Sequence, residues 1–557
     1  MTPAGMNRRA FVVRGAGAGL ALLSGGCGAS SPGGGARTVR LGIGSFGLPS
    51  PFAYIAGPGY VQMSLLYDTL VWKDASGRLL SWLARRFTRS RDGLTYTFSL
   101  RDGVRWHDGR ALTAHDVAFT FDYFRRQPLG PLIIAQPFGV KAARALDRLT
   151  VEVELELPAV TFLESVAGAV PIIPRHIWAP IDDAPAAQDT AVLVGSGPYR
   201  LRSFSLGEGT ALFVANERYF LGTPFVGRIE SRIVDDELIA LRAGEIDVAE
   251  TPPEGVADDV LAPFRADGSF GVVSEAGGFT FPLLWNLARA GALGDVRFRR
   301  ACALAIDRRA IVERLLGGNG RPGNPGFLPP GHPFHVGVEQ YPFDPQAANR
   351  LLDQAGYRRG APGGVRSGAD GQALRFGILV GNAPVPPFLD LLVAGLGEVG
   401  IELRPLAVDL PTLFGRLQEG AYEMAVSLYP GPGATAPGAD PDNLRTFYSS
   451  RIEGRLQGAR GYVDGRFDRL AREQLLTADP QERMRLVARM QRLIAEDVPA
   501  LPILYPTQFT AFRREVLDAW YYTPGGFAGG LPSVLNKHVF VTGSKTGLEI
   551  RRVPFPP

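Results

Sequence analysis

Residues 92–117 read DGLTYTFSLRDGVRWHDGRALTAHDV, and this stretch decides the fold. Tyr96, Phe98 and Leu100 alternate with polar residues, as the side chains of a half-buried strand do. Two Asp-Gly pairs follow, which are typical of turns because glycine readily adopts a left-handed backbone. Thr113 begins a capping box that an aspartate closes three residues later. The segment therefore predicts a strand, two turns and a capped helix.

Helix and strand patterns alternate along the rest of the chain. The segments concerned are the strands 151–157, 374–380 and 401–408, the helix 297–316, and two helices that begin at Asp344-Pro345 and Asp479-Pro480. The two aspartates are expected to be N-caps, each followed by proline at the first helical position. The helix 297–316 is expected to be a single amphipathic helix that ends at Gly317. This alternation predicts an α/β protein.

The first 27 residues have the layout of an export signal. Arg8 and Arg9 precede Phe11 and an apolar stretch, and small residues precede Cys27. The arginine pair resembles a twin-arginine signal, and the small residues resemble a lipoprotein processing site, with Cys27 lipidated after cleavage. Simple cleavage without lipidation is the alternative. Residues 28–37, rich in glycine and serine, are expected to be a flexible linker.

The chain after this signal is close to neutral. The 557 residues carry a formal charge of +4, of which Arg8, Arg9 and Arg14 supply three, so the remainder carries +1. Because no Lys/Arg block remains, no nucleic-acid partner is expected. Cys302 lies in an apolar run and is expected to be a buried thiol. After the N-terminus no uncharged apolar stretch is long enough to predict a membrane span.

Ordered motifs connect the chain to a known family. They are 92–117, Gly195-Ser196-Gly197-Pro198-Tyr199, 241–247, 299–301, 305–308, 341–345 and 351–357, in that order. In this sequence of motifs the chain resembles the bacterial extracellular solute-binding proteins of family 5, the peptide/nickel class that serves ABC importers. The resemblance extends from residue 38 to the end.

The resemblance implies an α/β fold of two lobes, a periplasmic-binding-protein-like clamp of type II with an extra inserted domain in the N-terminal lobe. The implied boundaries are 38–72, 192–282 and 503–557 for lobe 1, 73–191 for the inserted domain, and 283–502 for lobe 2. The lobes close on a ligand because the ligand contacts both of them. A periplasmic or other extracytoplasmic monomer is expected, which passes its ligand to the permease subunits of an ABC transporter.

Residues that could suggest catalysis or metal binding have a structural explanation. Ser196 lacks the Gly-x-Ser-x-Gly spacing of a nucleophile elbow. His332 and His335 lie in a Pro/Gly-rich stretch without a nearby carboxylate. Because the chain has no P-loop, any ATPase is a separate subunit. The sequence predicts neither an enzyme nor a resident cofactor or metal.

Five residues are expected to contact the ligand: Phe46, Trp285, Asn286, Tyr429 and Asp440. They follow predicted strands or occupy loops that face the cleft in the family. For Trp285, a place in the hydrophobic core is the alternative. Their aromatic character, with few charges, suits a peptide derivative, a sugar-like ligand or a metal chelate.

The ligand itself is the open question. In peptide-binding members, an aspartate four residues before the proline of an acid–Pro turn holds the ammonium group. Here the turn is Asp440-Pro441, and the corresponding residue is Pro437. An unpaired ammonium is costly to bury, so an ordinary free peptide is disfavoured unless Asp440 substitutes. A peptide-like ligand, a peptide derivative or a chelate is expected; a sugar-type ligand, and a sensor or chaperone function without transport, are the alternatives.

Overall fold

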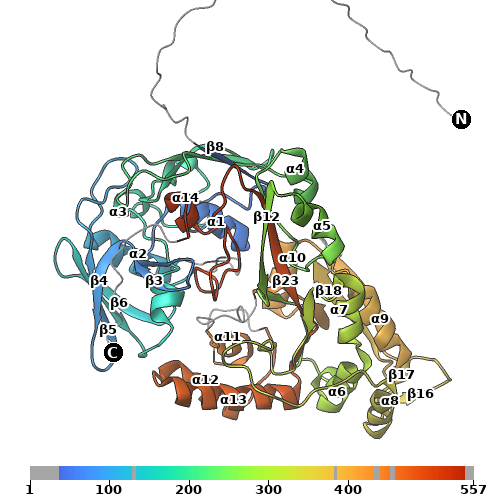
Figure 1. Cartoon of the computed structure of the whole chain (residues 1–557). Helices are drawn as coiled ribbons and strands as arrows, with labels where there is room; N and C mark the ends of the chain where they lie inside the picture. Colours follow the sequence, from blue (N-terminus) through green and yellow to red (C-terminus); the bar gives the residue numbers. More distant parts are fainter. Residues whose placement is uncertain are drawn as a thin grey trace, which may run out of the picture. The chain divides into compact units, whose positions relative to one another are not determined.

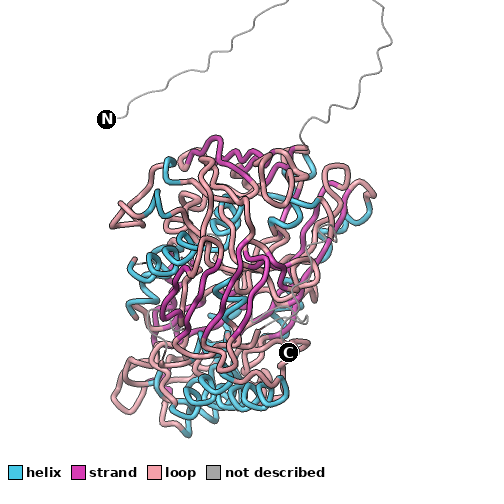
Figure 2. Tube along the Cα trace, turned by 90° about the vertical axis from the view of Figure 1, so that its left-hand side faces the viewer, coloured by secondary structure: helices cyan, strands magenta, loops and turns pink. Residues whose placement is uncertain are grey.

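The computed structural model describes residues 37–545, apart from 128, 130–132, 134, 382–384, 431–439 and 452–457. These residues belong to one compact unit, Arg37–Pro557. Strands and helices are interspersed along it, and the predicted α/β class is confirmed (Figure 1, Figure 2). Cys27 and Pro437 lie outside the described residues.

The larger sheet collects strands from distant parts of the chain. Its order is β12-β23-β11-β1-β10-β9-β8, with β15 paired to β23. The strands are β1 (Thr38–Leu41), β8 (Tyr199–Ser205), β9 (Thr210–Ala215), β10 (Arg228–Ser231), β11 (Val248–Glu250), β12 (Phe270–Ala276), β15 (Gly320–Pro322) and β23 (Leu504–Arg513). Because β1 is parallel to β10 and β11, their carboxyl ends share one edge. We call this body lobe 1.

A second sheet forms the centre of lobe 2, in the order β19-β18-β20-β14-β22. Its strands are β14 (Pro282–Trp285), β18 (Arg375–Gly381), β19 (Glu402–Val408), β20 (Met424–Val426) and β22 (Ala500–Pro502). β18 is parallel to both β19 and β20. Ile378 and Leu379 are consecutive but belong to different hydrophobic cores. Since strand side chains alternate between faces, lobe 2 has a core on each side of its sheet.

Helices cover both faces of the lobe 2 sheet. On one face lie α6 (Val296–Ala305), α7 (Arg308–Leu316), α8 (Pro345–Gln354) and α9 (Leu389–Glu398). On the other lie α10 (Leu410–Glu419), α11 (Asn443–Tyr448), α12 (Gly465–Leu476) and α13 (Pro480–Asp497). This layered arrangement is the usual way in which a largely parallel sheet buries both of its faces.

The segment that decided the fold forms part of a smaller, four-stranded sheet in the order β4-β5-β7-β6. The elements are β4 (Ala84–Arg89), β5 (Thr95–Leu100), β6 (Val140–Ala145), β7 (Thr150–Leu155) and the covering helix α2 (Ala114–Arg126). The predicted strand and capping box are both confirmed. Thr113 N donates to Asp116 Oδ2 at 2.9 Å, and Phe121 of α2 is buried in the same core as Phe98 of β5.

The remaining elements are short or lie beside the sheets. They are β2 (Val71–Lys73), β3 (Leu79–Ser81), β13 (Phe279–Thr280), β16 (Arg358–Arg359), β17 (Arg366–Ser367), β21 (Tyr429–Pro430), α1 (Ala56–Leu66), α3 (Arg175–Trp178), α4 (Glu237–Ala243), α5 (Asp258–Ala266), α14 (Lys537–Thr542), the π-helix η1 (Leu163–Ala167) and the 3₁₀ turns η2 (Thr190–Val192) and η3 (Ala292–Gly294). Among the helices that the structure describes, none has the length and apolar character needed to cross a membrane.

The prediction of a single helix over residues 297–316 is wrong. The chain forms two helices, α6 and α7, separated at Ile306, whose backbone is extended (φ −106°, ψ 112°). Asp307 caps α7 by accepting a hydrogen bond from Ala310 N at 2.9 Å. An aspartate inside a helical pattern can therefore begin a new helix, because its side chain satisfies a free N–H group. The N-caps at Asp344 and Asp479 are confirmed.

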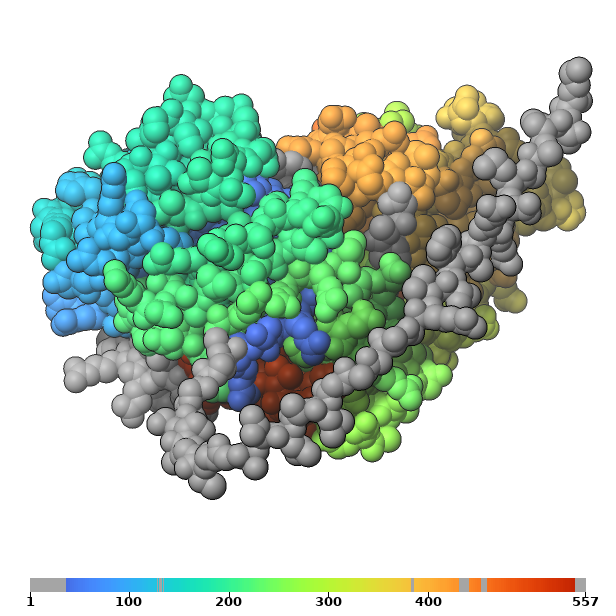
Figure 3. Space-filling view, turned by 90° about the horizontal axis from the view of Figure 1, so that it is seen from above, coloured from blue at the N-terminus to red at the C-terminus, as the bar shows by residue number. Residues whose placement is uncertain are grey.

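Segments from the two ends of the described chain lie side by side in lobe 1. Trp72 Nε1 donates to Asn536 Oδ1 at 2.7 Å, and Lys537 Nζ donates to Asp68 Oδ1 at 3.0 Å. In Figure 3, dark-red residues from the C-terminal part of the described chain lie beside blue residues from its N-terminal part. The segments between β12 and β14 and between β22 and β23 connect the sheet of lobe 1 with that of lobe 2, and β15, which lies between α7 and α8 of lobe 2, also joins the sheet of lobe 1 by pairing with β23.

Candidate ligand-binding site

The carboxyl ends of parallel strands form one edge in each lobe. In lobe 1 these ends belong to β1, β10 and β11, and in lobe 2 to β18, β19 and β20. Loops that follow such an edge are where α/β proteins bind ligands, because the strand ends leave a crevice there. Phe46 follows β1, while Tyr429 and Asp440 follow β20. Three of the five predicted contact residues therefore occupy this kind of edge.

Phe46 has a fixed backbone and an exposed part of its ring. Its carbonyl oxygen accepts a hydrogen bond from Ile55 N at 2.7 Å. Gly59 packs so closely that a Cβ atom there would lie 2.6 Å from the same oxygen. The Phe46 side chain is partly exposed and belongs to none of the hydrophobic cores formed by the described residues. A ring held in this way can contact a ligand without rearrangement of the backbone.

Tyr429 contacts both lobe 2 and β13, which lies in the segment that leads from β12 of lobe 1 to β14 of lobe 2. As part of β21 it pairs with Thr280 of β13. Its hydroxyl lies 3.2 Å from Thr446 Oγ1, and its ring meets Phe447 edge-on with centroids 4.7 Å apart. The side chain remains partly exposed. This placement makes it a rigid aromatic surface beside the connection between the lobes.

Asp440 already has a cationic partner. Arg483 of α13 donates to both of its carboxylate oxygens, at 2.7 and 2.9 Å. The Arg483 side chain is only 11% exposed and that of Asp440 is 30% exposed, so water reaches the pair mainly from the side of the carboxylate. A two-point pair between an arginine and a carboxylate is stronger than a single hydrogen bond, because two charge-assisted hydrogen bonds fix its geometry. An ammonium group from a ligand would have to compete with Arg483 for this carboxylate.

Trp285 and Asn286 lie at the opposite edge of the lobe 2 sheet. Trp285 pairs with Met424, the first residue of β20, whereas Tyr429 lies beyond the last. The Trp285 side chain is wholly buried, which is the alternative that the sequence left open. Asn286 Nδ2 donates to the carbonyl oxygens of Gly420 and Tyr422 at 3.0 Å each. These positions give no support to a role in ligand binding.

The chain that follows β7 contacts lobe 2 near the Asp440–Arg483 pair. Val160 N donates to Leu475 O of α12 at 3.0 Å. A few residues along the chain, Glu164 pairs with Lys73 at 2.8 Å. Burial raises the pKa of Glu164 and Lys73 opposes this rise, with smaller effects from Asp440 and Arg483. Two internal ion pairs, one from each lobe, therefore lie close enough to influence each other.

Three glutamates gather at the carboxyl edge of lobe 1, and the sequence analysis did not single them out. Glu250 ends β11, Glu275 lies near the end of β12, and Glu237 begins α4. Glu237 Oε2 accepts a hydrogen bond from Glu250 N at 2.9 Å. Burial raises the pKa of Glu237 to about 8, that of Glu250 to about 7 and that of Glu275 to about 8. In sequence they sit in ordinary strand and cap patterns, so no local signal marks them.

These carboxylates have few partners that stabilise a negative charge. Glu250 accepts hydrogen bonds from Ser533 Oγ and Val534 N, each at 3.0 Å. Within the part of the chain that the structure describes, none of the three glutamates forms an ion pair. Each side chain is partly exposed, so water and protons reach it. The edge of lobe 1 therefore carries groups that titrate near neutral pH.

The residues considered for catalysis or metal binding have structural partners. Ser196 Oγ donates to Asp68 Oδ2 at 2.9 Å and is buried. His332 Nδ1 accepts from Phe334 N at 3.1 Å, and His335 Nδ1 lies 3.0 Å from Leu328 O. Among the described residues, no group of three or more His, Cys, Asp or Glu side chains is arranged to hold a metal ion.

Comparison with known proteins identifies the family. Residues 78–454 match the model for bacterial extracellular solute-binding proteins, family 5 Middle. Heme-binding protein A of Haemophilus influenzae is 26% identical over 505 residues, which are 86% of this chain and 88% of that protein. Di/tripeptide-binding protein 2 of Pseudomonas aeruginosa is 26% identical over 482 residues, which are 81% of this chain and 86% of that protein.

A solved structure agrees with this assignment. The oligopeptide-binding protein AppA of Bacillus subtilis, in complex with a nonapeptide, matches with a TM-score of 0.76 at 21% identity, over 90% of this chain and 99% of that chain. The predicted two-lobed periplasmic-binding-protein fold is thereby confirmed. The chain belongs to family 5 of the bacterial extracellular solute-binding proteins.

Proposed function

We propose that this chain captures a small ligand outside the cytoplasm, encloses it between its two lobes and delivers it to the permease of an ABC importer. The observation that carries the proposal is the arrangement of the two sheets. Phe46 follows β1 of lobe 1, Tyr429 follows β20 of lobe 2, and short segments of the chain connect the two sheets. Such a connection allows the lobes to rotate and enclose a ligand that touches both. No catalytic group is needed for this task.

The ligand that we propose is a peptide derivative, a peptide-like compound or a metal chelate. The relatives support this range, because their names refer to heme and to di- and tripeptides. The pairing of Asp440 with Arg483 also supports it, since that carboxylate is engaged and a free ammonium would need another partner. We therefore expect ligands whose amine is blocked or absent to bind better than the matching free peptides.

A ligand screen on residues 28–557 tests the proposal. Peptides, N-acetylated peptides, heme, ferric and nickel chelates, and sugars would be compared by thermal unfolding and X-ray scattering. A true ligand at about 100 times its Kd stabilises the native state by about 2.7 kcal/mol, so a rise in Tm of several degrees with a smaller radius of gyration is expected. A screen in which no compound changes either quantity contradicts ligand capture.

Variants then connect binding with the proposed site. Phe46→Ala is expected to weaken the ligand found in the screen about tenfold, because it removes an aromatic contact from the edge of lobe 1. Phe343→Ala is the matched control, since Phe343 is a 45% exposed phenylalanine in lobe 2. Uptake of labelled ligand by cells with and without the gene separates transport from sensing. Equal affinity of both variants would contradict the placement of the site.

Export and anchoring by the N-terminal signal form a further part of the proposal. If Cys27 is lipidated, Cys27→Ser is expected to move the protein from the membrane fraction to the soluble extracytoplasmic fraction, because the acyl chains supply the membrane affinity. Replacing Ser24 with Ala leaves the cysteine in place and serves as the control. Unchanged membrane partition of Cys27→Ser would contradict lipidation and favour simple cleavage.

A further inference from the structure

Several arginines of lobe 1 lie at the amino edge of its sheet, opposite the edge from which the loop with Phe46 leaves. Arg37 directly precedes β1, and its carbonyl oxygen accepts a hydrogen bond from Arg228 N at 3.1 Å. Arg228 begins β10 and pairs with Val214 of β9, which in turn pairs with Arg200 of β8, at the top of Figure 1. Since residues that pair across strands point to the same side, Arg228 and Arg200 lie on one face of the sheet.

A further arginine and a lysine extend this group. Arg200 Nη2 donates to Asn216 Oδ1 at 3.4 Å, and Arg218 N donates to the same oxygen at 3.3 Å. Each basic residue of the group is exposed to water. We call the group the basic face, and it consists of Arg37, Arg200, Arg218, Arg228 and Lys545.

The basic face has an excess of positive charge. Within the described part of the chain, Arg228 is the one member that forms an ion pair, with Glu230 at 2.9 Å. Glu217, which precedes Arg218, adds a second negative charge. Five basic side chains against two acidic ones leave an excess of three positive charges. Residues 28–557 as a whole carry only +1, so this excess is a local concentration of charge.

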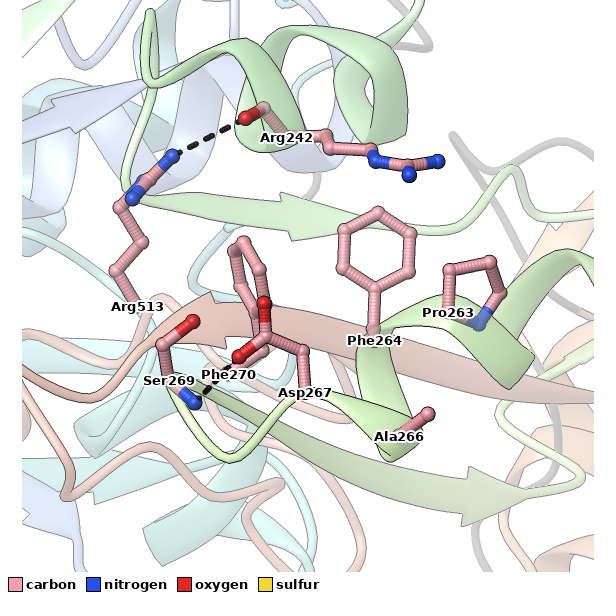
Figure 4. A pocket seen from close by; sticks show the side chains of 8 residues that line it. All are labelled: Arg242, Pro263, Phe264, Ala266, Asp267, Ser269, Phe270 and Arg513. Carbon is pink, nitrogen blue, oxygen red and sulfur yellow. Dashed lines mark hydrogen bonds between the residues drawn. The ribbon is translucent and has the colours of Figure 1, made fainter.

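The other half of the same edge is balanced in charge. Arg513 N donates there to the carbonyl oxygen of Asp247, the residue before β11, at 2.9 Å. A pocket beside α4 and α5 is lined by Arg242 and Arg513, together with Asp267 (Figure 4). Glu515 lies 3.8 Å from Arg513. Because two acids offset the two arginines, the excess charge belongs to the half of the edge that β1, β8, β9 and β10 form.

An exposed aromatic ring lies beside the basic face. Phe225 is 44% exposed, and the guanidinium of Arg37 lies over its ring, 4.8 Å from the centroid. Phe225 N donates to Val541 O at 3.0 Å, and Gly543 packs so closely that a Cβ atom there would overlap the ring. The ring is therefore held in place although nearly half of it is exposed. An apolar ring among basic side chains suits the headgroup layer of a membrane, which accommodates both.

The linker from Cys27 joins the folded body at this face. Nine residues, 28–36, separate Cys27 from Arg37. A chain of nine residues reaches at most about 30 Å when fully extended. If Cys27 is acylated, Arg37 and its neighbours therefore stay within about this distance of the bilayer. Among the surfaces of the body, the basic face is the one that the linker keeps near lipid.

We propose that the basic face, together with Phe225, rests on a membrane surface that contains anionic phospholipids. The headgroup phosphates would accept hydrogen bonds from the arginines, and Phe225 would enter the headgroup layer. Anionic membranes attract clusters of Lys and Arg in this way. Because Arg37 precedes β1 and Phe46 follows it, the candidate ligand-binding edge stays free in this orientation. The contact goes beyond the proposed function, since it requires neither a captured ligand nor an acyl chain.

The test measures the sedimentation of residues 28–557, which carry no acyl chain, with sucrose-loaded vesicles. Vesicles of equal parts phosphatidylglycerol and phosphatidylcholine are compared with vesicles of phosphatidylcholine alone. At low salt, the partition coefficient for the anionic vesicles is expected to be at least about tenfold larger. Raising NaCl to about 500 mM should remove most of this difference, because the Debye length falls to about 4 Å.

A triple variant connects binding with the basic face. Arg37→Gln, Arg200→Gln and Arg218→Gln together should weaken partition into the anionic vesicles at least about tenfold. Thermal unfolding of the variant checks that its Tm is retained.

The matched control removes the same charge from lobe 2. Arg469, Arg472 and Arg489 are exposed arginines of α12 and α13, and all three are changed to Gln. This control should weaken binding less than about twofold, because its arginines lie far along the chain from the linker and outside the basic face.

A single variant tests the aromatic ring. Phe225→Ser should weaken binding to the anionic vesicles about threefold or more, since salt does not screen the burial of an apolar ring. Phe343→Ser is its control, because Phe343 is 45% exposed and belongs to lobe 2. The proposal is overturned if the two kinds of vesicle bind equally, if the triple variant of the basic face binds as the parent does, or if the lobe 2 control weakens binding as much. These results leave the test of ligand capture unaffected, because that test uses no membrane.

Discussion

Lys537→Met is expected to lower the free energy of unfolding by about 3–5 kcal/mol. Lys537 and Asp68 form an ion pair at 3.0 Å in which neither side chain is exposed. The same ammonium lies over the Trp72 ring, 4.2 Å from its centroid. Removing the lysine leaves the Asp68 carboxylate charged and buried without its cation, and this uncompensated charge is the main cost. Urea unfolding followed by circular dichroism would measure the loss.

Two controls separate burial from charge pairing in general. Glu154→Gln breaks the ion pair between Glu154, which is 39% exposed, and Lys141, which is 60% exposed. This variant is expected to lower the free energy of unfolding by less than about 1 kcal/mol. The double variant Asp68→Asn with Lys537→Met is expected to be more stable than Lys537→Met alone, because no buried charge remains. A single variant that loses no more than Glu154→Gln would show that this pair does not hold the two ends of the chain together.

The buried pair also shows where sequence reasoning stops. Asp68 and Lys537 are 469 residues apart, and three other side chains, Trp82, Ser196 and Tyr219, donate to the same carboxylate. Each of these residues is ordinary in its own segment. Only the folded topology brings them together, so no local pattern could predict the network.

The local elements of the fold were predictable because short-range chemistry determines them. Aspartates and threonine at N-caps, glycines in turns and the alternation of β5 need only their sequence neighbours. The break between α6 and α7 was missed because the same apolar periodicity continues across Ile306 and hides the cap at Asp307. The two-lobed architecture came from the order of family motifs and not from periodicity.

The candidate site was predictable only in part. Phe46, Tyr429 and Asp440 were chosen because they follow predicted strands or occupy loops that face the cleft in the family, and in the structure the strands that they follow end at a carboxyl edge. Trp285 is the last residue of β14, which runs antiparallel to β20. The end of β14 therefore lies at the edge of the lobe 2 sheet opposite to the one where β20 ends. The direction of a strand within a sheet is a tertiary property. The same limit applies to the pairing of Asp440 with Arg483, which are 43 residues apart.

The three glutamates of lobe 1 are expected to lower the free energy of unfolding as the pH rises. Burial raises the pKa of Glu275 from 4.5 to about 8. Below pH 4.5 the carboxyl group is protonated in both the folded and the unfolded state and has no effect on stability. Between 4.5 and about 8 the unfolded state ionises while the folded state keeps its proton, so stability falls as pH rises. Above about pH 8 the penalty is complete.

Glu275→Gln removes the ionisable group and is expected to stabilise the protein at pH 9 by about 2–3 kcal/mol, after allowance for partial solvent screening. At pH 4 the variant and the parent should unfold at the same denaturant concentration. Glu208→Gln changes an exposed glutamate and should follow the parent at every pH. Glu237 and Glu250, whose pKa values are raised to about 8 and about 7, still titrate in Glu275→Gln. The variant should therefore reduce the pH dependence without abolishing it. If its stability stays below that of the parent at pH 9, the carboxyl group of Glu275 is stabilised as an anion, and burial does not control its ionisation.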